Sequence, residues 1–208
     1  MTGHIVLLGD SMLDNAKYVA KGQSVAELLR GLVSEDWRVT LKAVSGAVVN
    51  DVMEKQLVQI PDDTSHIVLS VGGNNALQWA REWFEKPTET IGSAVRALCS
   101  PVGGFTSQYE ALVRQMLLRK TPVIVCTIYD SVPDFDPAEL LGLSFFNDTI
   151  TRIALRNELP LIDLRSLCDE RTDYCSQSPI EPSEKGGHKI ASAINDAVRN
   201  QMPCSATQ

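Results

Sequence analysis

Five short, largely apolar runs rich in valine and isoleucine alternate with longer segments that have a helical pattern. The runs are HIVLL from His4, WRVTLKAV from Trp37, HIVLSV from His66, PVIVCTI from Pro122 and PLIDL from Pro160. Runs of this kind are typical of strands buried on both faces, as in a parallel sheet covered by helices on each side. The pattern therefore predicts a three-layer α/β fold with a mainly parallel, five-stranded sheet.

The segments between these runs carry signals for helices. Ser24 with Glu27, and Ser107 with Glu110, have the spacing of a capping box, so each pair is expected to begin a helix. The segment ALQWAREWFEKP from Ala76 is also helical in pattern and is expected to form an insertion over the sheet.

The length of the chain suits one domain. A chain of 208 residues can bury one core without disulfides or a structural metal. It has no repeat, no low-complexity linker and no change of composition that would divide it. Residues 1–208 are therefore expected to form a single domain.

The charge of the chain argues against a nucleic-acid partner. Its net charge is -7, and its basic residues form no run, whereas phosphate binding needs clustered lysine and arginine. The N-terminal segment MTGHIVLLGDSM has an apolar stretch too short for a signal peptide or a membrane span. We therefore expect a cytoplasmic protein that binds neither nucleic acid nor membrane.

The cysteines and histidines do not indicate a cofactor. No Cys-x-x-Cys pair is present and there are only three histidines, so neither a zinc site nor another cofactor is expected. In a reducing cytosol the cysteines are expected to be free thiols, although Cys168 and Cys175 are close enough in sequence for a short disulfide loop. The five cysteines are Cys99, Cys126, Cys168, Cys175 and Cys204.

Small polar residues follow the predicted strands. The motif GDSM begins at Gly9 after the first run, SGAV at Ser45 after the second, GGNN at Gly72 after the third, and Tyr129-Asp130 comes after the fourth. Ligands of parallel α/β folds bind at the carboxyl ends of the strands. The sequence therefore predicts a ligand site at this edge of the sheet.

The residue types at this edge suit attack by a serine on a carbonyl group. Ser11 on a tight turn would be an exposed nucleophile whose own amide can stabilise the developing oxyanion. Gly46 lets a second N–H approach the same point, and the Asn74 side chain can add a third donor. In one alternative interpretation, Ser11, Gly46 and Asn74 are ordinary turn and cap residues. In another, Asp10 is an acid for Mg²⁺ or for phosphoryl transfer.

The order and spacing of these motifs resemble the first three blocks of the SGNH, or GDSL, hydrolase family. The matching residues are Gly9-Asp10-Ser11, Gly46 and Gly72-Gly73-Asn74-Asn75. The resemblance implies that Ser11 is the nucleophile and that Gly46 and Asn74 are oxyanion donors. It also implies a flavodoxin-like sheet and hydrolysis of esters, thioesters or acetylated sugars without a metal or organic cofactor.

The last block of that family departs from its pattern in this chain. The family has Asp-x-x-His-Pro-Ser-x-x-Gly, in which the histidine is the general base and the aspartate orients it. Aligned on Pro182-Ser183 and Gly186, the chain has Glu181 at the histidine position and Ser178 at the aspartate position. The sequence therefore leaves the general base open.

Two residues near this block are candidates for the base. Ser183 is expected to cap the final helix, whose apolar stripe turns His188 toward solvent at about 100° per residue. Glu181 is the better placed by alignment, but a position just before a helix N-terminus is expected to keep its pKa low and make it a weak base. The stripe consists of Ile190, Ala191, Ile194, Ala197 and Val198.

The other titratable residues are less suited to that role. His4 and His66 begin their strands, at the edge opposite Ser11, and cannot reach it in a parallel sheet. Asp130 follows the fourth strand and is a further acid near the site.

Three hypotheses about function follow. The chain is an esterase that acts on a small acyl ester, a binding protein that has kept the pocket and lost turnover, or an acyltransferase that excludes water. The segment REWFEKP from Arg81 is a candidate for shaping the pocket, while Phe145 and Phe146 are expected to pack in the core.

Overall fold

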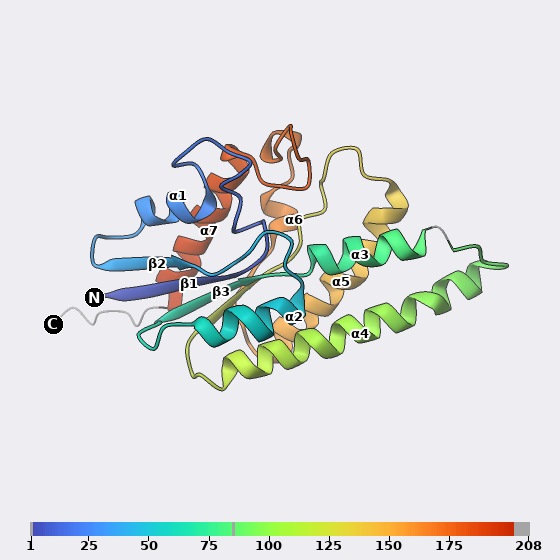
Figure 1. Cartoon of the computed structure of the whole chain (residues 1–208), viewed down its shortest axis with the longest axis horizontal. Coiled ribbons are helices and arrows are strands. Elements are labelled where there is room, and N and C mark those ends of the chain that lie inside the picture. The colour runs from blue at the N-terminus through green and yellow to red at the C-terminus, as the bar shows by residue number, and fades with distance from the viewer. Residues whose placement is uncertain (1, 85, 202–208) are drawn as a thin grey trace.

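Five parallel strands form one sheet in the computed structural model, which describes residues 2–84 and 86–201 (Figure 1). Across the sheet the order is β2-β1-β3-β4-β5, and every neighbouring pair is parallel. This is the strand order of flavodoxin-like folds, so the predicted fold class is confirmed. The strands are β1 (Gly3–Gly9), β2 (Trp37–Leu41), β3 (His66–Ser70), β4 (Val123–Cys126) and β5 (Leu161–Ile162).

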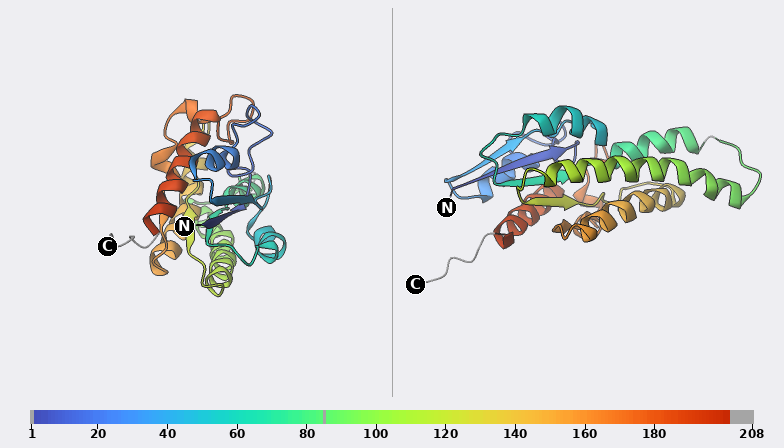
Figure 2. Two further views of the ribbon diagram at one scale, coloured as in Figure 1. Left: turned by 90° about the vertical axis from the view of Figure 1, so that its left-hand side faces the viewer. Right: turned by 90° about the horizontal axis from the view of Figure 1, so that it is seen from below.

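Helices cover both faces of the sheet (Figure 2). One face carries α1 (Val25–Leu32), α6 (Leu164–Leu167) and α7 (Glu184–Gln201). The other carries α2 (Val49–Asp51), α4 (Ile91–Leu117) and α5 (Pro137–Arg156). Short helical turns extend the connections, namely η1 (Val52–Gln56), η2 (Leu57–Gln59) and η3 (Arg171–Asp173).

The central strands are largely apolar because they supply two cores. Ile5 and Leu7 of β1 pack with the core beneath α1 and α7, whereas Val6 and Leu8 pack with the core beneath α4 and α5. Successive side chains of a strand point to opposite faces, so a strand covered on both sides needs apolar residues at every position.

The strands β2, β3, β4 and β5 are each shorter than the apolar runs predict, and the ends of β2 and β5 have a clear local cause. β2 ends at Leu41 because the amides of Lys42 and Ala43 both bond to the Leu7 carbonyl at 2.9 Å, which turns the chain out of the sheet. β5 ends at Ile162 because Asp163 caps α6 by accepting from the amide of Arg165.

The capping box of α1 is confirmed, but the one proposed for Ser107 is wrong. Ser24 and Glu27 bond reciprocally at the start of α1. Ser107 instead lies inside α4, where its hydroxyl donates to the Gly103 carbonyl at 3.0 Å. Helix α4 begins sixteen residues earlier, where Thr90 caps it.

The helix predicted as an insertion over the sheet lies elsewhere. It is α3 (Gly73–Trp83), and with parts of α4 and α5 it projects beyond the carboxyl ends of the strands (Figure 2, right). Its apolar side chains meet α5, since the rings of Trp79 and Phe146 have centroids 5.9 Å apart. Phe146 is buried in the core, as expected, whereas Phe145 is only half-buried.

The four cysteines within the described residues are unpaired, so Cys168 and Cys175 do not form a disulfide in this structure. Cys204 lies outside the described residues. None of the helices in the described part of the chain has the length and apolar character that crossing a bilayer requires.

The end of β1 provides a test of the fold. Gly9 has φ of +136°, and a Cβ at this position would lie 1.7 Å from the Ser70 carbonyl oxygen. We expect Gly9→Ala to lower the free energy of unfolding by about 3 kcal/mol or more, as measured by denaturant titration. Gly103→Ala, at an exposed helical glycine with open space around it, is the control and should be neutral or slightly stabilising. Equal stability of the two variants would contradict this account of β1.

Candidate active site

Ser11 lies on a tight turn directly after β1. The Asp10 amide donates to the Ser70 carbonyl at 3.1 Å, and the Asp10 carbonyl accepts from the amides of Leu13 and Asp14. Asp10 Oδ1 also accepts from the Met12 amide at 3.2 Å. The turn leaves the Ser11 N–H without an acceptor among residues 2–84 and 86–201, so this N–H is available to a ligand.

Buried Gln56 holds the start of this turn. Its Oε1 accepts from the Gly9 amide and its Nε2 donates to the Gly9 carbonyl, both at 2.8 Å. The side chain therefore satisfies both backbone groups of Gly9 from η1, which fixes where β1 ends.

Hydrogen bonds tie the Gly46 segment to the segments that carry Ser11 and Asn74. The Ser45 amide donates to Asp14 Oδ2 at 2.9 Å, and Asn74 Nδ2 donates to the Ala47 carbonyl at 3.1 Å. Gly46 lies between these two contacts, with φ of +85° and an exposed backbone. Asn74 stands in the first turn of α3, and its second amide N–H is free to reach a ligand.

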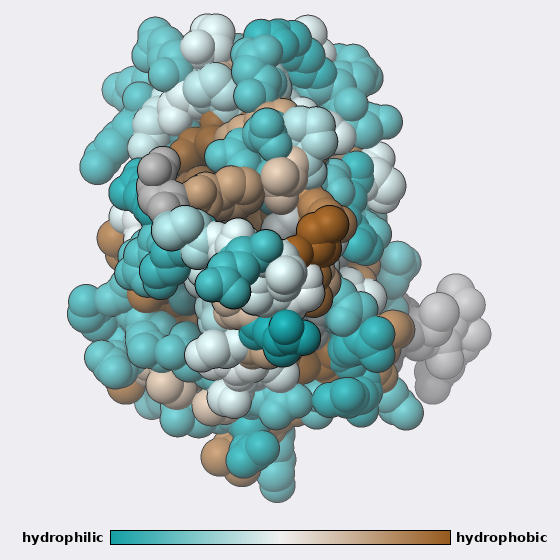
Figure 3. All heavy atoms as spheres, turned by 90° about the vertical axis from the view of Figure 1, so that its right-hand side faces the viewer, coloured by the Kyte–Doolittle hydropathy of each residue, from teal (hydrophilic) through white to brown (hydrophobic). Residues whose placement is uncertain are grey.

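A cavity opens beside Ser11 at the carboxyl edge of the sheet. Its empty volume is about 840 Å³, the open mouth included, and Ser11 and Asn74 line it together. Gly46 does not line the cavity, whereas Phe84 from the REWFEKP segment does. Figure 3 shows the end of the molecule where α3 ends and α4 begins, and hydrophobic residues are exposed there in a recess surrounded by hydrophilic ones.

The carboxyl group of Glu181 is buried next to the Ser11 hydroxyl. Glu181 is 3% exposed, and its Oε2 has no hydrogen-bond partner within the described residues. Burial raises the pKa of this carboxyl to about 7, a hydrogen bond from the Ser11 side chain opposes the rise, and the charge of Asp14 adds to it. A carboxylate with a pKa near neutrality is suited to accept a proton from a hydroxyl at physiological pH.

The expectation that the helix N-terminus would keep the pKa of Glu181 low is therefore wrong. Helix α7 begins three residues later, and its first turn is capped by Ser183, whose Oγ accepts from the Gly186 amide at 3.2 Å. The carboxyl group of Glu181 accepts no hydrogen bond from that turn. Desolvation, which favours the neutral acid, consequently dominates over the helix dipole.

Asp10 is a second buried acid at this site. Burial raises the pKa of its carboxyl to about 7, against a hydrogen bond from the Met12 amide, and the charge of Glu181 raises it further. Burial also raises the pKa of Asp130, which the guanidinium of Arg165 opposes. Within the described residues, no three His, Cys, Asp or Glu side chains gather closely enough to hold a metal ion.

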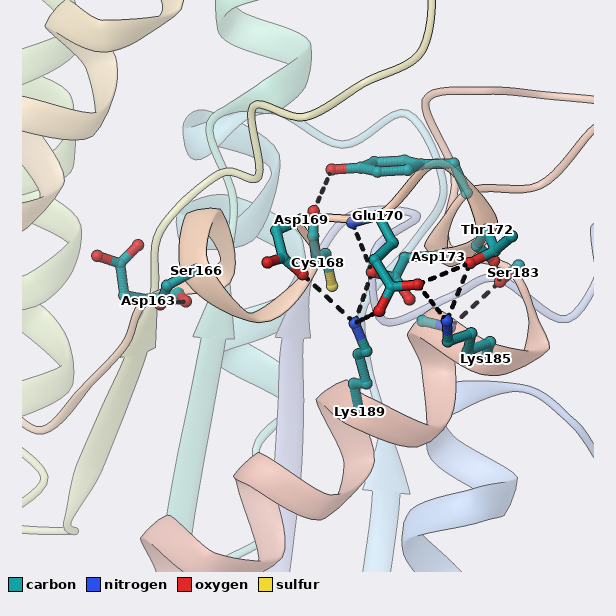
Figure 4. A network of polar contacts seen from close by, with 12 residues as sticks. Asp163, Ser166, Cys168, Asp169, Glu170, Thr172, Asp173, Ser183, Lys185 and Lys189 are labelled. Atoms are coloured by element: carbon teal, nitrogen blue, oxygen red, sulfur yellow. Dashed lines mark hydrogen bonds and ion pairs between the residues drawn. The ribbon is translucent and has the colours of Figure 1, made fainter.

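A network of charged residues holds the loop that carries Glu181 (Figure 4). Lys189 Nζ bonds to Asp173 Oδ2 at 2.7 Å, and Lys185 Nζ bonds to Glu170 at 2.6 Å. The Asp173 carbonyl accepts from the Ser183 amide at 2.8 Å. The loop before Glu181 is thereby fastened to the first turns of α7.

Asn15 fixes the same loop from the other side. This fully buried residue donates from Nδ2 to the Pro182 carbonyl at 3.3 Å and accepts from the Val25 amide at 2.9 Å. No motif in the sequence marks Asn15, Asp14 or Gln56 as part of the site. Their signal was weak, because single polar residues in loops are common and only the fold shows that Asn15 and Gln56 are buried.

A known family model matches most of the chain. The family model described as "GDSL-like Lipase/Acylhydrolase family" matches residues 7–188. The chain belongs to this family. No curated protein matches the chain.

Solved structures share the fold of this GDSL family member at low sequence identity. A lipase from a goat rumen metagenome has a TM-score of 0.73 and a sequence identity of 15%, and the match covers 94% of this chain and 97% of the lipase chain. A lipolytic G-D-S-L family protein from Veillonella parvula has a TM-score of 0.71 and a sequence identity of 18%, and the match covers 97% of this chain and 100% of the Veillonella chain. A psychrotrophic esterase from Pseudoalteromonas sp. has a TM-score of 0.68 and a sequence identity of 16%, and the match covers 95% of this chain and 97% of the esterase chain.

The histidines of this GDSL family member lie away from Ser11. His188 is exposed on α7, as its helical phase indicates. His4 and His66 stand at the starts of β1 and β3, and His4 bonds there to Thr40 and Asp63. The Ser11 side chain instead influences the pKa of Glu181, which a hydrogen bond from Ser11 lowers against the effect of burial.

The raised pKa of Glu181 makes stability depend on pH. The pKa is about 7 in the fold, above its ordinary value of 4.5. Neutral Glu181 is therefore favoured in the folded state, and this contribution is complete below about pH 4 and is lost as pH rises through about 7. Glu181→Gln removes this titration. The free energy of unfolding of the variant, relative to that of the wild type, should rise by about 2 kcal/mol from pH 5 to pH 8, as measured by denaturant titration.

Glu184→Gln is the matched control, because Glu184 is exposed three residues further on. If the free energies of unfolding of Glu181→Gln and the wild type differ by the same amount at pH 5 and pH 8, the pKa of Glu181 is not raised in the fold.

Proposed function

We propose that the chain is a serine ester hydrolase in which Glu181 takes the role that histidine has in its family. The observation that carries the proposal is the buried Glu181 carboxyl against the Ser11 hydroxyl, at the position where the family pattern has its base. Ser11 is the proposed nucleophile, and its own N–H, the Gly46 N–H and the Asn74 side chain are the proposed oxyanion donors.

In the first half of the proposed reaction, the Glu181 carboxylate takes the proton of the Ser11 hydroxyl while Oγ bonds to the ester carbonyl carbon. The carbonyl electron pair moves to oxygen, and the three N–H donors stabilise that charge. When the tetrahedral intermediate collapses, the bond to the alcohol oxygen breaks. Glu181 returns its proton to that oxygen, which leaves an acyl group on Ser11.

In the second half, Glu181 takes a proton from water while the water oxygen bonds to the acyl carbon. Collapse of the second tetrahedral intermediate breaks the bond to Oγ, and Glu181 returns the proton to Ser11. The acid and the free enzyme result, so one carboxyl group serves as base and acid in turn.

Two features support a base of this kind. The partly open cavity admits both an ester and water to Ser11. The loop that carries Glu181 is fixed by Asn15 and by the network around Lys189, so the carboxyl does not need to be ordered when substrate binds.

The proposed nucleophile and donors give the first kinetic prediction. Ser11→Ala should abolish hydrolysis of p-nitrophenyl esters, and Asn74→Ala should lower kcat by about a hundredfold or more, because one oxyanion donor is lost. Steady-state kinetics measures both. Wild-type turnover in Ser11→Ala would show that another group does the chemistry, and a folded wild type that turns over no ester would favour a binding protein.

The identity of the base gives the second kinetic prediction. A base acts when ionised, so kcat/KM should rise with pH through about 7, the pKa of Glu181, and level off above it. Glu181→Gln should lose about a hundredfold or more and should also lose this inflection. The pH profile of kcat/KM measures both effects.

His188→Ala is the control for that experiment and should keep the rate within about twofold together with the inflection. The pH profile alone does not separate the two residues, because an ordinary histidine titrates near ~6.5. If His188→Ala is as inactive as Ser11→Ala while the fold is intact, His188 is the base.

A further inference from the structure

The cavity beside Ser11 continues along one whole face of α3. The lining residues Gly73, Leu77, Ala80 and Phe84 recur every three or four positions, which is the spacing of a single helical face. The face runs from the Ser11 end of the cavity at Gly73 to Phe84, which is 47% exposed. Eleven residues at 1.5 Å each make a wall about 16 Å long.

The start of α5 forms the opposite wall. Phe135, just before the helix, and Gly142 and Leu143 within it line the cavity. A Cβ at Gly142 would lie 3.4 Å from Cζ3 of Trp79, which is ordinary contact. Alanine would therefore fit at position 142, whereas a longer side chain would occupy the space between the helices.

The lining is almost free of charge along this length. The charged residues in the described part of the lining are Asp10, at the Ser11 end, and Glu139, which accepts from the Asp136 amide in the capping box of α5. Among the described lining residues there is no lysine, arginine or histidine to pair with an acidic group on a ligand. An apolar chain is therefore the ligand that these walls accommodate without burying an unpaired charge.

We propose that the substrate is an ester of an unbranched, uncharged acyl chain of medium length, which lies between α3 and α5 along a wall of about 16 Å. Gly142 and Ala80, on opposite walls, determine the chain length that fits. This proposal rests on the proposed function of Ser11, and it replaces the small acyl group expected from the sequence by a medium-length one.

The test compares p-nitrophenyl acetate, butyrate, octanoate and decanoate. In the wild type, kcat/KM should rise about threefold to fourfold per added methylene up to the length that the channel holds. Gly142→Leu and Ala80→Phe, one on each wall, should each lower the ratio of kcat/KM for decanoate to that for acetate by about tenfold or more. Two variants are used so that one remains if the other fails to fold.

Gly103→Leu and Ala97→Phe are the matched controls, because both lie on the exposed part of α4 and neither lines the cavity beside Ser11. They should keep the wild-type chain-length profile. A wild-type profile that is flat or falls from acetate upward would overturn the proposal, and so would unchanged profiles in both Gly142→Leu and Ala80→Phe.

Binding without turnover separates this proposal from the proposed function. Calorimetry with 1-decanol and 1-butanol, two uncharged probes, should show tighter binding of decanol to the wild type and weaker binding to Ala80→Phe. That result supports the channel even if no ester is cleaved, in which case only the proposed function fails. Absence of decanol binding to the wild type would overturn the channel.

Discussion

The pairing of Gly9 with Ser70 at the ends of β1 and β3 determines where the site can form. These two residues are partners in the parallel register, and the Ser70 carbonyl accepts from the Asp10 amide in the space that a Cβ of Gly9 would fill. Ser11 follows one strand and Asn74 follows the other, so the register brings a hydroxyl and an amide side chain to one cavity. Gln56 strengthens the arrangement by bonding to both backbone groups of Gly9.

The second constraint is the burial of a carboxyl group that has few partners. Glu181 is nearly inaccessible, and one of its oxygens has no hydrogen-bond partner within the described residues, which is unfavourable for the folded state when the group is charged. The ion pairs of Lys189 and Lys185 and the buried amide of Asn15 hold the loop despite that cost. Local destabilisation at one residue, compensated by its surroundings, is common where a protein needs a group with an altered pKa.

The sequence predicts some parts of this molecule well because their signals are local. The fold class follows from apolar runs that a doubly covered sheet requires, and the exposure of His188 follows from helical phase alone. The start of α4 could not be predicted in the same way. Ser107 and Glu110 have the spacing of a cap, and Pro101 precedes them as it would at a helix boundary, yet packing of α4 against the core carries the helix through both.

The altered pKa of Glu181 could not be predicted either, because it depends on groups distant in sequence. Alignment placed Glu181 at the position of the family's base, but the dipole of α7 argued for a low pKa. Ser11 and Asp14 meet Glu181 only in the folded chain, where desolvation outweighs that dipole. The apolar channel beside Ser11 is likewise a tertiary feature, since its walls come from α3 and from the start of α5.

The distribution of tryptophans gives the molecule an optical property. Of the three tryptophans, Trp79 lines the cavity and its ring centroid lies 4.5 Å from that of Trp83, while Trp37 packs against His66 at the opposite edge of the sheet. Indole emission depends on the polarity around the ring, so a ligand that displaces water from the cavity is expected to change the emission of Trp79 and to leave that of Trp37 unaltered. The chain thus contains its own fluorescent reporter of channel occupancy, without any attached dye.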